Sequence, residues 1–151
     1  MRLDTERQSQ VAAALEHLQL PEDIVIRMWQ QSDFPTIQKL SRVEGWTTPE
    51  LRPQDALAAW QHSWPTLVAT DGESIVGFVR ALTDGEVNMF VTELLIDARL
   101  RGQGIGRALL DVCHYLYPRV RIDLISTEQA NGFYLAHGFR FVGEGLRKSY
   151  I

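Results

Sequence analysis

The alternation of hydrophobic and polar positions divides this chain into short strands and amphipathic helices. Val11, Leu15 and Leu18 recur at helical spacing, as do Ile105 and Leu109 further along. Apolar runs of four to ten residues bounded by turn residues predict strands. The predicted helices cover residues 5–20, a segment beginning near 32, and residues 54–62, 104–117 and 131–137. The predicted strands cover residues 24–28, 66–70, 75–82, 87–96 and 121–125.

Turn residues predict how these strands are connected. Asp71-Gly72 and Asp84-Gly85 are two-residue hairpin signals, so the three strands around them form an antiparallel meander. A helix crosses from the strand that runs from Val87 to Ile96 to the strand at 121–125, which predicts that these two strands are parallel. Residues 139–142 and 146–150 are expected to close the sheet as a hairpin.

This order of elements predicts an α/β protein of mixed α+β type. The central sheet is mostly antiparallel, with helices on both faces. A chain of 151 residues is expected to form one domain, residues 1–151, in which residues 1–20 are an accessory N-terminal helix. The strict β-α alternation of a doubly wound sheet is absent.

A glycine-rich loop joins the fourth predicted strand to the longest later helix. It reads Arg101-Gly102-Gln103-Gly104-Ile105-Gly106-Arg107. Three glycines at alternate positions let the backbone bend sharply and bring its N–H groups close to a ligand. The following helix adds its unpaired N–H groups and the positive end of its dipole. The loop is therefore predicted to bind a diphosphate.

Two common phosphate loops fit this sequence poorly. The Walker loop requires Gly-Lys followed by Ser or Thr, whereas Gly106 is followed by Arg107 and Ala108. The dinucleotide fingerprint would begin at Gly102, and its third glycine would then fall on Arg107. Asp123 does lie about 20 residues further on, as that fingerprint expects, so the dinucleotide alternative stays open on this loop alone.

Composition and charge exclude several classes of function. The formal net charge is −4, which argues against nucleic acid as a partner. No apolar run approaches the ~20 residues that span a bilayer, and the charged N-terminus lacks an apolar signal region. The expected location is cytoplasmic. The one cysteine, Cys113, and the four histidines show no metal-ligand spacing, so no metal is expected.

The element order and two motifs together resemble the GNAT-type N-acetyltransferases. The first motif is Arg101-x-x-Gly104-x-Gly106 after an apolar strand. The second is Asn131-Gly132-Phe133-Tyr134, followed by Gly138-Phe139. The resemblance covers roughly residues 24–150. It implies transfer of an acetyl group from acetyl-coenzyme A to an amine, on a sheet that splays between the 87–96 and 121–125 strands.

The resemblance also implies roles for individual residues. The backbone of Leu94 and Ile96 would bind the pantetheine arm, and residues 101–107 would hold the diphosphate. Asn131 would contact the coenzyme. Tyr134 would protonate the departing thiolate, although packing on the core is the alternative reading of this tyrosine.

The acceptor side offers two candidate residues. Glu93 is the only acidic residue inside the central strand, and it is a candidate for the base that deprotonates the amine or for a binder of a cationic substrate. A solvated polar position is the alternative. Trp46, between two early helices, is a candidate wall of the acceptor pocket, whereas Trp60 and Trp64 are expected in the core.

We therefore expect an acyltransferase that acts on a small-molecule or peptide amine, as a monomer or homodimer and without a membrane partner. A coenzyme A-binding module without catalysis and a dinucleotide-dependent oxidoreductase are the alternatives. The identity of the acceptor is not encoded in any motif of the sequence.

Overall fold

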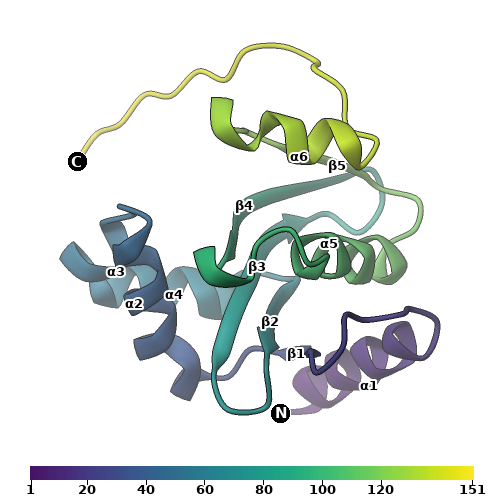
Figure 1. Cartoon of the computed structure of the whole chain (residues 1–151). Coiled ribbons are helices and arrows are strands. Elements are labelled where there is room, and N and C mark those ends of the chain that lie inside the picture. The colour runs from purple at the N-terminus through teal and green to yellow at the C-terminus, as the bar shows by residue number, and fades with distance from the viewer.

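The computed structural model describes residues 1–151 as a sheet covered by helices (Figure 1). The α-helices are α1 (Arg2–Glu16), α2 (Phe34–Val43), α3 (Thr48–Leu51), α4 (Pro53–His62), α5 (Ile105–Leu116) and α6 (Asn131–Ala136). The strands are β1 (Val25–Met28), β2 (Thr66–Thr70), β3 (Ile75–Thr83), β4 (Asn88–Ile96) and β5 (Arg121–Leu124). Three short 3-10 helices lie at Gln31–Asp33, Ala98–Leu100 and Glu128–Ala130.

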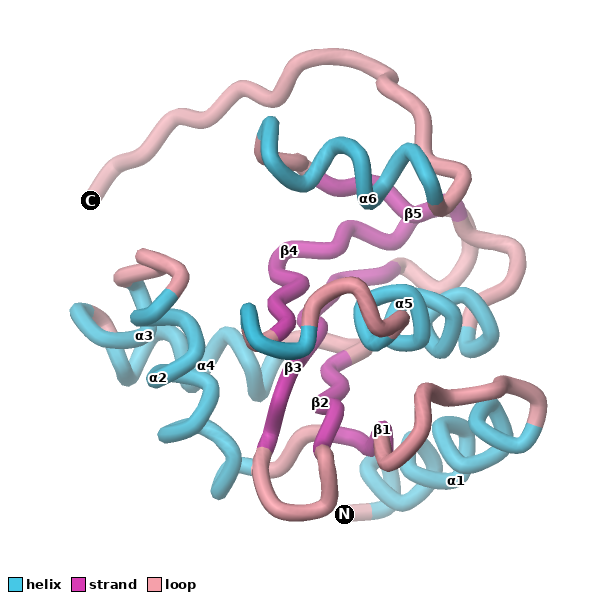
Figure 2. The backbone as a smooth tube through the Cα atoms, in the orientation of Figure 1, coloured by secondary structure: helices cyan, strands magenta, loops and turns pink.

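The five strands form one sheet in the order β1-β2-β3-β4-β5 (Figure 2). The first four strands pair in antiparallel fashion, and β5 runs parallel to β4. Helix α5 makes the crossover that this parallel pair requires. The predicted meander, the parallel fourth and fifth strands and the mixed α+β class are all confirmed.

Each face of the sheet carries its own apolar cluster. The cluster on one face gathers Val11 and Ala14 of α1 with Leu109 and Val112 of α5, all of them almost fully buried. The cluster on the other face contains side chains of α2, α4 and the sheet: Phe34, Ile37, Ala56, Trp60, Val68, Ile75, Phe78 and Leu95. Helices therefore cover both faces, as the sequence predicted.

A β-bulge at Thr92 divides β4 into two halves. Arg80 of β3 pairs with Glu93, yet its neighbour Ala81 pairs with Val91, so Thr92 is the extra residue. The Thr92 hydroxyl donates to the Arg80 carbonyl oxygen at 2.9 Å. Because side chains alternate along a strand, one inserted residue changes which positions face which side.

The two halves of β4 consequently serve different faces of the sheet. Met89 and Val91, before the bulge, belong to the α1–α5 cluster. Leu95, after the bulge, belongs to the α2–α4 cluster. Glu93 has the same parity as Leu95, so its side chain lies on the α2–α4 side.

Strand β4 also loses its β5 neighbour beyond the bulge. The parallel pairing runs from Asn88 opposite Arg121 to Val91 opposite Leu124 and stops there. Residues 93–96 keep their pairing with β3 alone. The splay between these two strands, expected from the sequence, is confirmed.

The main-chain groups of Leu94 and Ile96 face this open edge. The Asp97 N–H donates to the Val76 carbonyl of β3 at 2.7 Å. The main-chain N–H and C=O groups of successive residues point to alternate sides of a strand. Because those of Asp97 point toward β3, those of Leu94 and Ile96 point away from it.

The predicted C-terminal hairpin is wrong. After α6 the chain is extended and has no ladder partner, as the yellow end of the ribbon in Figure 1 shows. The side chains of Phe141, Leu146 and Tyr150 are 67%, 93% and 82% exposed. An isolated two-stranded hairpin is marginal in water, and here only Phe139 packs on the core while the other apolar side chains of both arms stay exposed.

Smaller differences concern the helix boundaries. Helix α1 begins earlier than predicted, at Arg2. It also ends earlier, because residues 17–24 form the connection to β1. Helix α3 occupies part of what was expected to be a loop, where Pro49 supports a helical first turn. No helix in the structure has both the length and the apolar character needed to cross a membrane.

The exposed C-terminal segment should be the first part of the chain that a protease removes. Trypsin is expected to cleave after Arg140, Arg147 and Lys148 before it cleaves elsewhere, since extended and exposed backbone fits a protease active site. Mass spectrometry of a short digestion should show an intact product ending at residue 140. Resistance of these three sites would instead support the hairpin.

Helix α1 is expected to stabilise the fold without contributing to ligand binding. Val11→Ala should lower the free energy of unfolding by about 1–3 kcal/mol, because Val11 is 3% exposed within the core cluster. Leu3→Ala, on the same helix but 56% exposed, is the control and should change stability by less than about 0.5 kcal/mol. Urea unfolding measures both variants. Equal effects would contradict the packing of α1 on the sheet.

Candidate active site

The glycine-rich loop turns the chain from β4 into α5 through two left-handed residues. Gly102 has φ +79° and Gly104 has φ +89°. A residue with a Cβ atom is destabilised in this region by roughly 1–2 kcal/mol, so glycine is the fitting choice at both positions. Space is not the reason, since a Cβ on Gly104 would come no closer than 3.7 Å to Pro21 and one on Gly102 would meet nothing.

The backbone N–H groups of residues 102–107 have no acceptor within the protein. They belong to the loop and to the first turn of α5, whose dipole places partial positive charge at the same end. Consecutive unpaired donors at the start of a twelve-residue helix suit an anion, and the N–H groups of residues 102–107 are called the cradle below. Gln103, Ile105 and Arg107 contribute such donors, and the Arg107 side chain lies 3.7 Å from Asp111.

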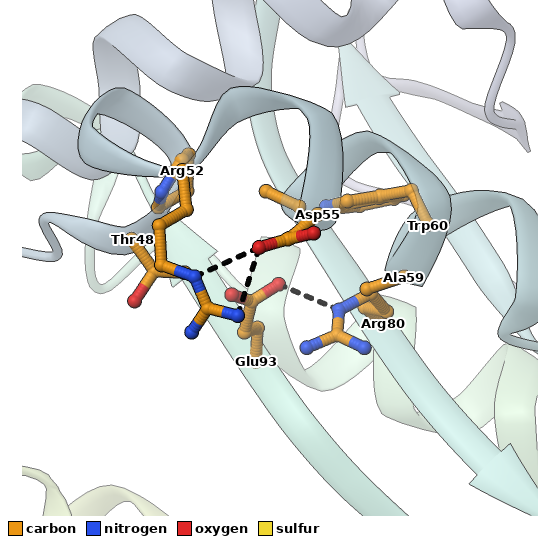
Figure 3. Close-up of a pocket in the computed structure, with 9 residues that line it drawn as sticks. Thr48, Arg52, Asp55, Ala59, Trp60, Arg80 and Glu93 are labelled. Atoms are coloured by element: carbon orange, nitrogen blue, oxygen red, sulfur yellow. Dashed lines mark hydrogen bonds and ion pairs between the residues drawn. The ribbon is translucent and has the colours of Figure 1, made fainter. Parts of the chain in front are cut away.

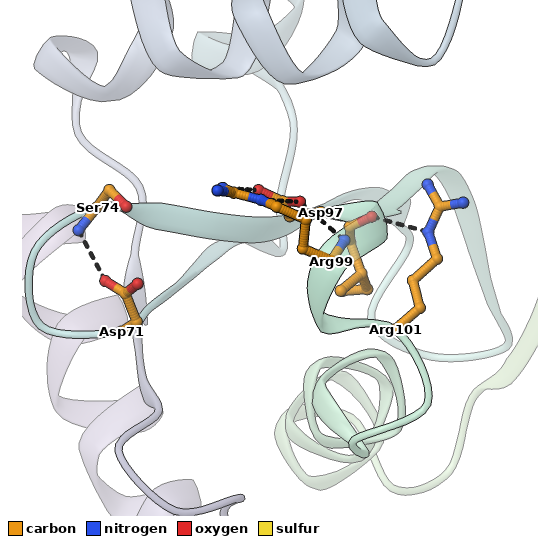
Figure 4. A network of polar contacts seen from close by, with 6 residues as sticks. Asp71, Ser74, Asp97, Arg99 and Arg101 are labelled. Atoms are coloured by element: carbon orange, nitrogen blue, oxygen red, sulfur yellow. Dashed lines mark hydrogen bonds and ion pairs between the residues drawn. The ribbon is translucent and has the colours of Figure 1, made fainter.

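Arg101 is held away from this cradle by two acceptors. Its Nε donates to the Ile96 carbonyl at 3.0 Å (Figure 4). Its terminal nitrogen pairs with the Glu44 carboxylate just after α2. The side chain thus bridges the end of β4 and the end of α2. The sequence placed Arg101 among the diphosphate ligands, whereas the structure gives its charge a protein partner.

Asp97 fixes the turn that precedes the loop. Its carboxylate accepts from the Arg99 N–H at 3.0 Å and from the Arg99 guanidinium at 2.7 Å (Figure 4). The guanidinium and the N–H of Arg99 hold the pKa of Asp97 below its ordinary value. In the nearby β2–β3 turn, the Ser74 and Glu73 N–H groups lower the pKa of Asp71. Asp97 thus caps the short helix at Ala98–Leu100. The sequence analysis did not predict this cap, although an Asp two residues before Arg99 is a local signal for one.

Gly106 serves a different purpose from the other two glycines. A Cβ atom there would lie 3.1 Å from Cζ of Phe133 and 3.6 Å from Cγ1 of Ile96. The missing side chain therefore lets α6 approach the first turn of α5 and the end of β4. This close approach brings the second motif next to the first.

Tyr134 lies beside this contact, on α6. Its ring packs edge-on against Phe133 and Phe139, with ring centroids 5.0 Å and 5.3 Å away. Burial raises the pKa of the Tyr134 hydroxyl above its ordinary value of 10, so the group stays protonated at neutral pH. Asn131 begins the same helix, and its side chain makes no hydrogen bond within the protein.

On the other side of β4, Glu93 lies in a polar hollow of about 210 Å³ (Figure 3). Arg80, its cross-strand partner, donates from Nε to Oε2 of Glu93 at 2.9 Å and from a terminal nitrogen to the Ser63 hydroxyl at 3.0 Å. The Glu93 and Arg80 side chains are 20% and 17% exposed. Glu93 is thus a half-buried, partnered carboxylate rather than a solvated surface residue.

The other walls of this hollow come from α3 and α4. They include Thr48, Arg52 and Asp55, which sequence analysis did not single out. The spacing of Arg52 and Asp55, three residues apart, was the available signal. Trp46 does not line the hollow and packs against the edge of the α2–α4 cluster, whereas Trp60 is both a core residue and part of the floor.

Cysteine chemistry plays no part in this arrangement. Cys113 lies on the buried face of α5 with no exposed surface. Burial raises the pKa of its thiol to about 12, so the nucleophilic thiolate does not form at neutral pH.

Residues 62–141 match the family described as the acetyltransferase (GNAT) domain, which is more than half of the chain. The splayed sheet, the glycine-rich cradle and the neighbouring α6 form one arrangement, and the chain that builds it belongs to the GNAT family of acetyltransferases. It is accordingly an acyltransferase. An oxidoreductase of the doubly wound type is excluded by the mostly antiparallel sheet.

Solved structures share this fold. A GNAT-family acetyltransferase from Streptococcus pneumoniae superposes with a TM-score of 0.68 at 24% identity, covering 84% of this chain and 98% of that one. The PaiA N-acetyltransferase from Thermoplasma acidophilum, in complex with coenzyme A, gives 0.64 at 16% identity, covering 76% and 87%. An aminoglycoside acetyltransferase from a soil metagenomic sample, in complex with trehalose, gives 0.63 at 16%, covering 85% and 95%.

The cradle can be tested with a matched pair of glycine substitutions. Gly104→Ala and Gly72→Ala both place a Cβ on a left-handed residue, at φ +89° and +95°, and neither Cβ meets a clash: the nearest atom to the first is Pro21 Cγ at 3.7 Å. Both should therefore lower stability by a similar, small amount. Coenzyme A affinity measured by calorimetry should fall at least tenfold only for Gly104→Ala, because the methyl group and the altered backbone disturb the N–H cradle. Equal affinities for the two variants would remove the loop from ligand binding.

Proposed function

We propose that this protein transfers the acetyl group of acetyl-coenzyme A to a primary amine by direct attack. Members of the GNAT family use acetyl-coenzyme A and act on amines. The proposal adds which residues of this chain bind the co-substrate and move the protons. The observation that carries it is the open edge of β4, residues 92–96, which leads directly into a loop of unpaired N–H groups. An open strand edge that is followed along the chain by an anion cradle suits a ligand with amide groups at one end and a diphosphate at the other.

The residues present fit such a co-substrate. The N–H groups of residues 102–107 would hold the diphosphate, with added positive charge from Arg107. The main-chain groups of Leu94 and Ile96 would pair with the amides of the pantetheine arm, as a further strand would. For the Ile96 carbonyl to take part, Arg101 must release it, and a neighbouring phosphate offers that guanidinium a new partner. Asn131 is an additional polar contact on α6.

The co-substrate supplies an activated acetyl thioester whose leaving group is a thiolate. The Tyr134 Oη carries a proton at neutral pH and would give it to that thiolate, since the raised pKa keeps the hydroxyl neutral. Glu93 would take the proton that the acceptor ammonium must lose, directly or through water. Trp46 remains a proposed outer wall of the acceptor site.

Removing the Tyr134 hydroxyl should slow the reaction without disturbing binding. Tyr134→Phe keeps the packing against Phe133 and Phe139, so the fold and the KM for acetyl-coenzyme A should persist. The kcat should fall about tenfold or more, within the range expected for one proton donor. Steady-state kinetics from pH 6 to 9 measure this, and the hydroxyl stays protonated throughout that range.

Tyr115→Phe is the matched control for this experiment. Tyr115 lies on α5 and stacks on His17 with ring centroids 5.1 Å apart, away from the proposed site. Its kcat should equal that of the unmodified protein. A Tyr134→Phe enzyme with full turnover over the whole pH range would leave Tyr134 as a packing residue only.

A further inference from the structure

The polar hollow on the α2–α4 side of β4 combines charges of both signs. Two guanidinium groups, of Arg52 and Arg80, alternate with two carboxylates, of Asp55 and Glu93 (Figure 3). Its formal charge is therefore balanced. A strongly cationic acceptor such as a polyamine would bring several charges for which the hollow has too few partners.

The two ion pairs differ in how firmly they are held. Arg80 and Glu93 are mostly buried, and Ser63 fixes the guanidinium from a third side. Arg52 and Asp55 are 46% and 63% exposed and lie three residues apart on the surface. Exposed pairs of this kind contribute about 0–1 kcal/mol, so a ligand group can exchange with one partner.

Glu93 in the buried pair and Arg52 in the exposed pair can each bind a group of a ligand. Oε1 of Glu93 accepts no hydrogen bond from the protein, and Glu93 lies on β4 next to the open edge at Leu94. Nε of Arg52 donates to Oδ2 of Asp55 at 2.8 Å, and a terminal nitrogen of Arg52 lies 2.8 Å from the same oxygen. These two donors point the same way, so a ligand carboxylate can take one on each of its oxygens. The apolar part of the hollow, formed by Ala56 and Trp60, can contact carbon atoms.

From this arrangement we infer that the acceptor is a small zwitterion, an α-amino acid or a compact molecule with the same two groups. Its ammonium group binds Glu93, and its carboxylate replaces Asp55 on Arg52. This inference rests on the acetyl transfer proposed above. A hollow of about 210 Å³ is smaller than the sites of drug-sized ligands, which suits an acceptor of amino-acid size.

The chemical balance of the step follows from these positions. The acceptor ammonium loses one proton to Glu93 and its nitrogen forms a bond to the acetyl carbon. The carbon–sulfur bond of the thioester breaks, and the departing thiolate receives a proton from Tyr134. The second proton, which the nitrogen loses on becoming an amide, returns to Tyr134, and Glu93 releases the first proton to solvent. The products are an N-acetylated amino acid, which keeps its carboxylate on Arg52, and free coenzyme A.

The first test compares each amino acid of a panel with the amine that remains when its carboxylate is removed. Phenylalanine with phenethylamine is one such pair, and spermidine is added as a polycation. The kcat/KM should favour the amino acid by about 10- to 100-fold, the value of a charge-assisted pair of hydrogen bonds. Equal or better use of the decarboxylated amines, or of spermidine, would overturn the inference.

The second test uses Arg52 as a specificity residue. Arg52→Ala should raise the KM for the amino acid about 10- to 100-fold, leave the decarboxylated amine unaffected, and leave the KM for acetyl-coenzyme A unchanged. Arg52→Lys should restore part of the loss. Arg42→Ala is the control, because Arg42 is another exposed arginine, at 59% against 46% for Arg52, and is paired with Glu50 outside the hollow.

A binding measurement separates this inference from the function on which it rests. Ligand-observed NMR with the coenzyme A-loaded protein should detect the amino acid, and Arg52→Ala should abolish that signal. If coenzyme A binds and simple amines are acetylated as well as amino acids, the acceptor assignment fails while acetyl transfer stands. If the folded protein binds no coenzyme A and acetylates no amine, both fail.

Discussion

The end of hydrogen bonding between β4 and β5 at Val91 is the constraint on which the rest of this structure depends. A strand in the middle of a sheet normally has partners on both edges, because unpaired backbone groups away from water are costly. Here β4 continues for five residues past its last β5 partner, with β3 alone beside it. The main-chain groups of Leu94 and Ile96 thereby face an edge without a strand, where Arg101 occupies the Ile96 carbonyl, and the loop that follows adds unpaired donors up to the first turn of α5.

The neighbourhood of this edge is organised by side-chain size and by charge. Gly106 has no side chain, so Phe133 can approach and bring α6 against the first turn of α5. On the opposite face the charges are paired in advance, Arg80 with Glu93 and Arg52 with Asp55. One side of β4 therefore offers neutral backbone donors to an anion, and the other offers a balanced set of charges.

Much of the fold could be predicted from local sequence. The turn pairs Asp71-Gly72 and Asp84-Gly85 and the helical period of Ile105 and Leu109 each act over a few residues, and the structure agrees with them. The prediction of a hairpin after residue 138 was wrong, because the two predicted strands have no other element of the fold to pair with or pack against. The bulge at Thr92 and the role of Gly106 were beyond sequence reasoning, since both depend on contacts between distant segments. Arg52 and Asp55 carry a local signal in their spacing, but their position beside Glu93 depends on how α4 packs over β4. Glu93 was singled out by its isolation in an apolar strand, and its role stays a prediction.

The bulge has a consequence for how this protein can vary. Because Thr92 shifts the alternation by one position, Met89 and Val91 are constrained by the packing of α1 and α5, while Glu93 and Leu95 are constrained by α2–α4. Substitutions that reshape the α2–α4 side of β4, where the acceptor site is proposed, thus leave the opposite core untouched, although both lie on a single strand of nine residues. Substrate preference and core stability can diverge independently along the same stretch of chain, and one hydroxyl bonded to the Arg80 carbonyl marks the boundary between them.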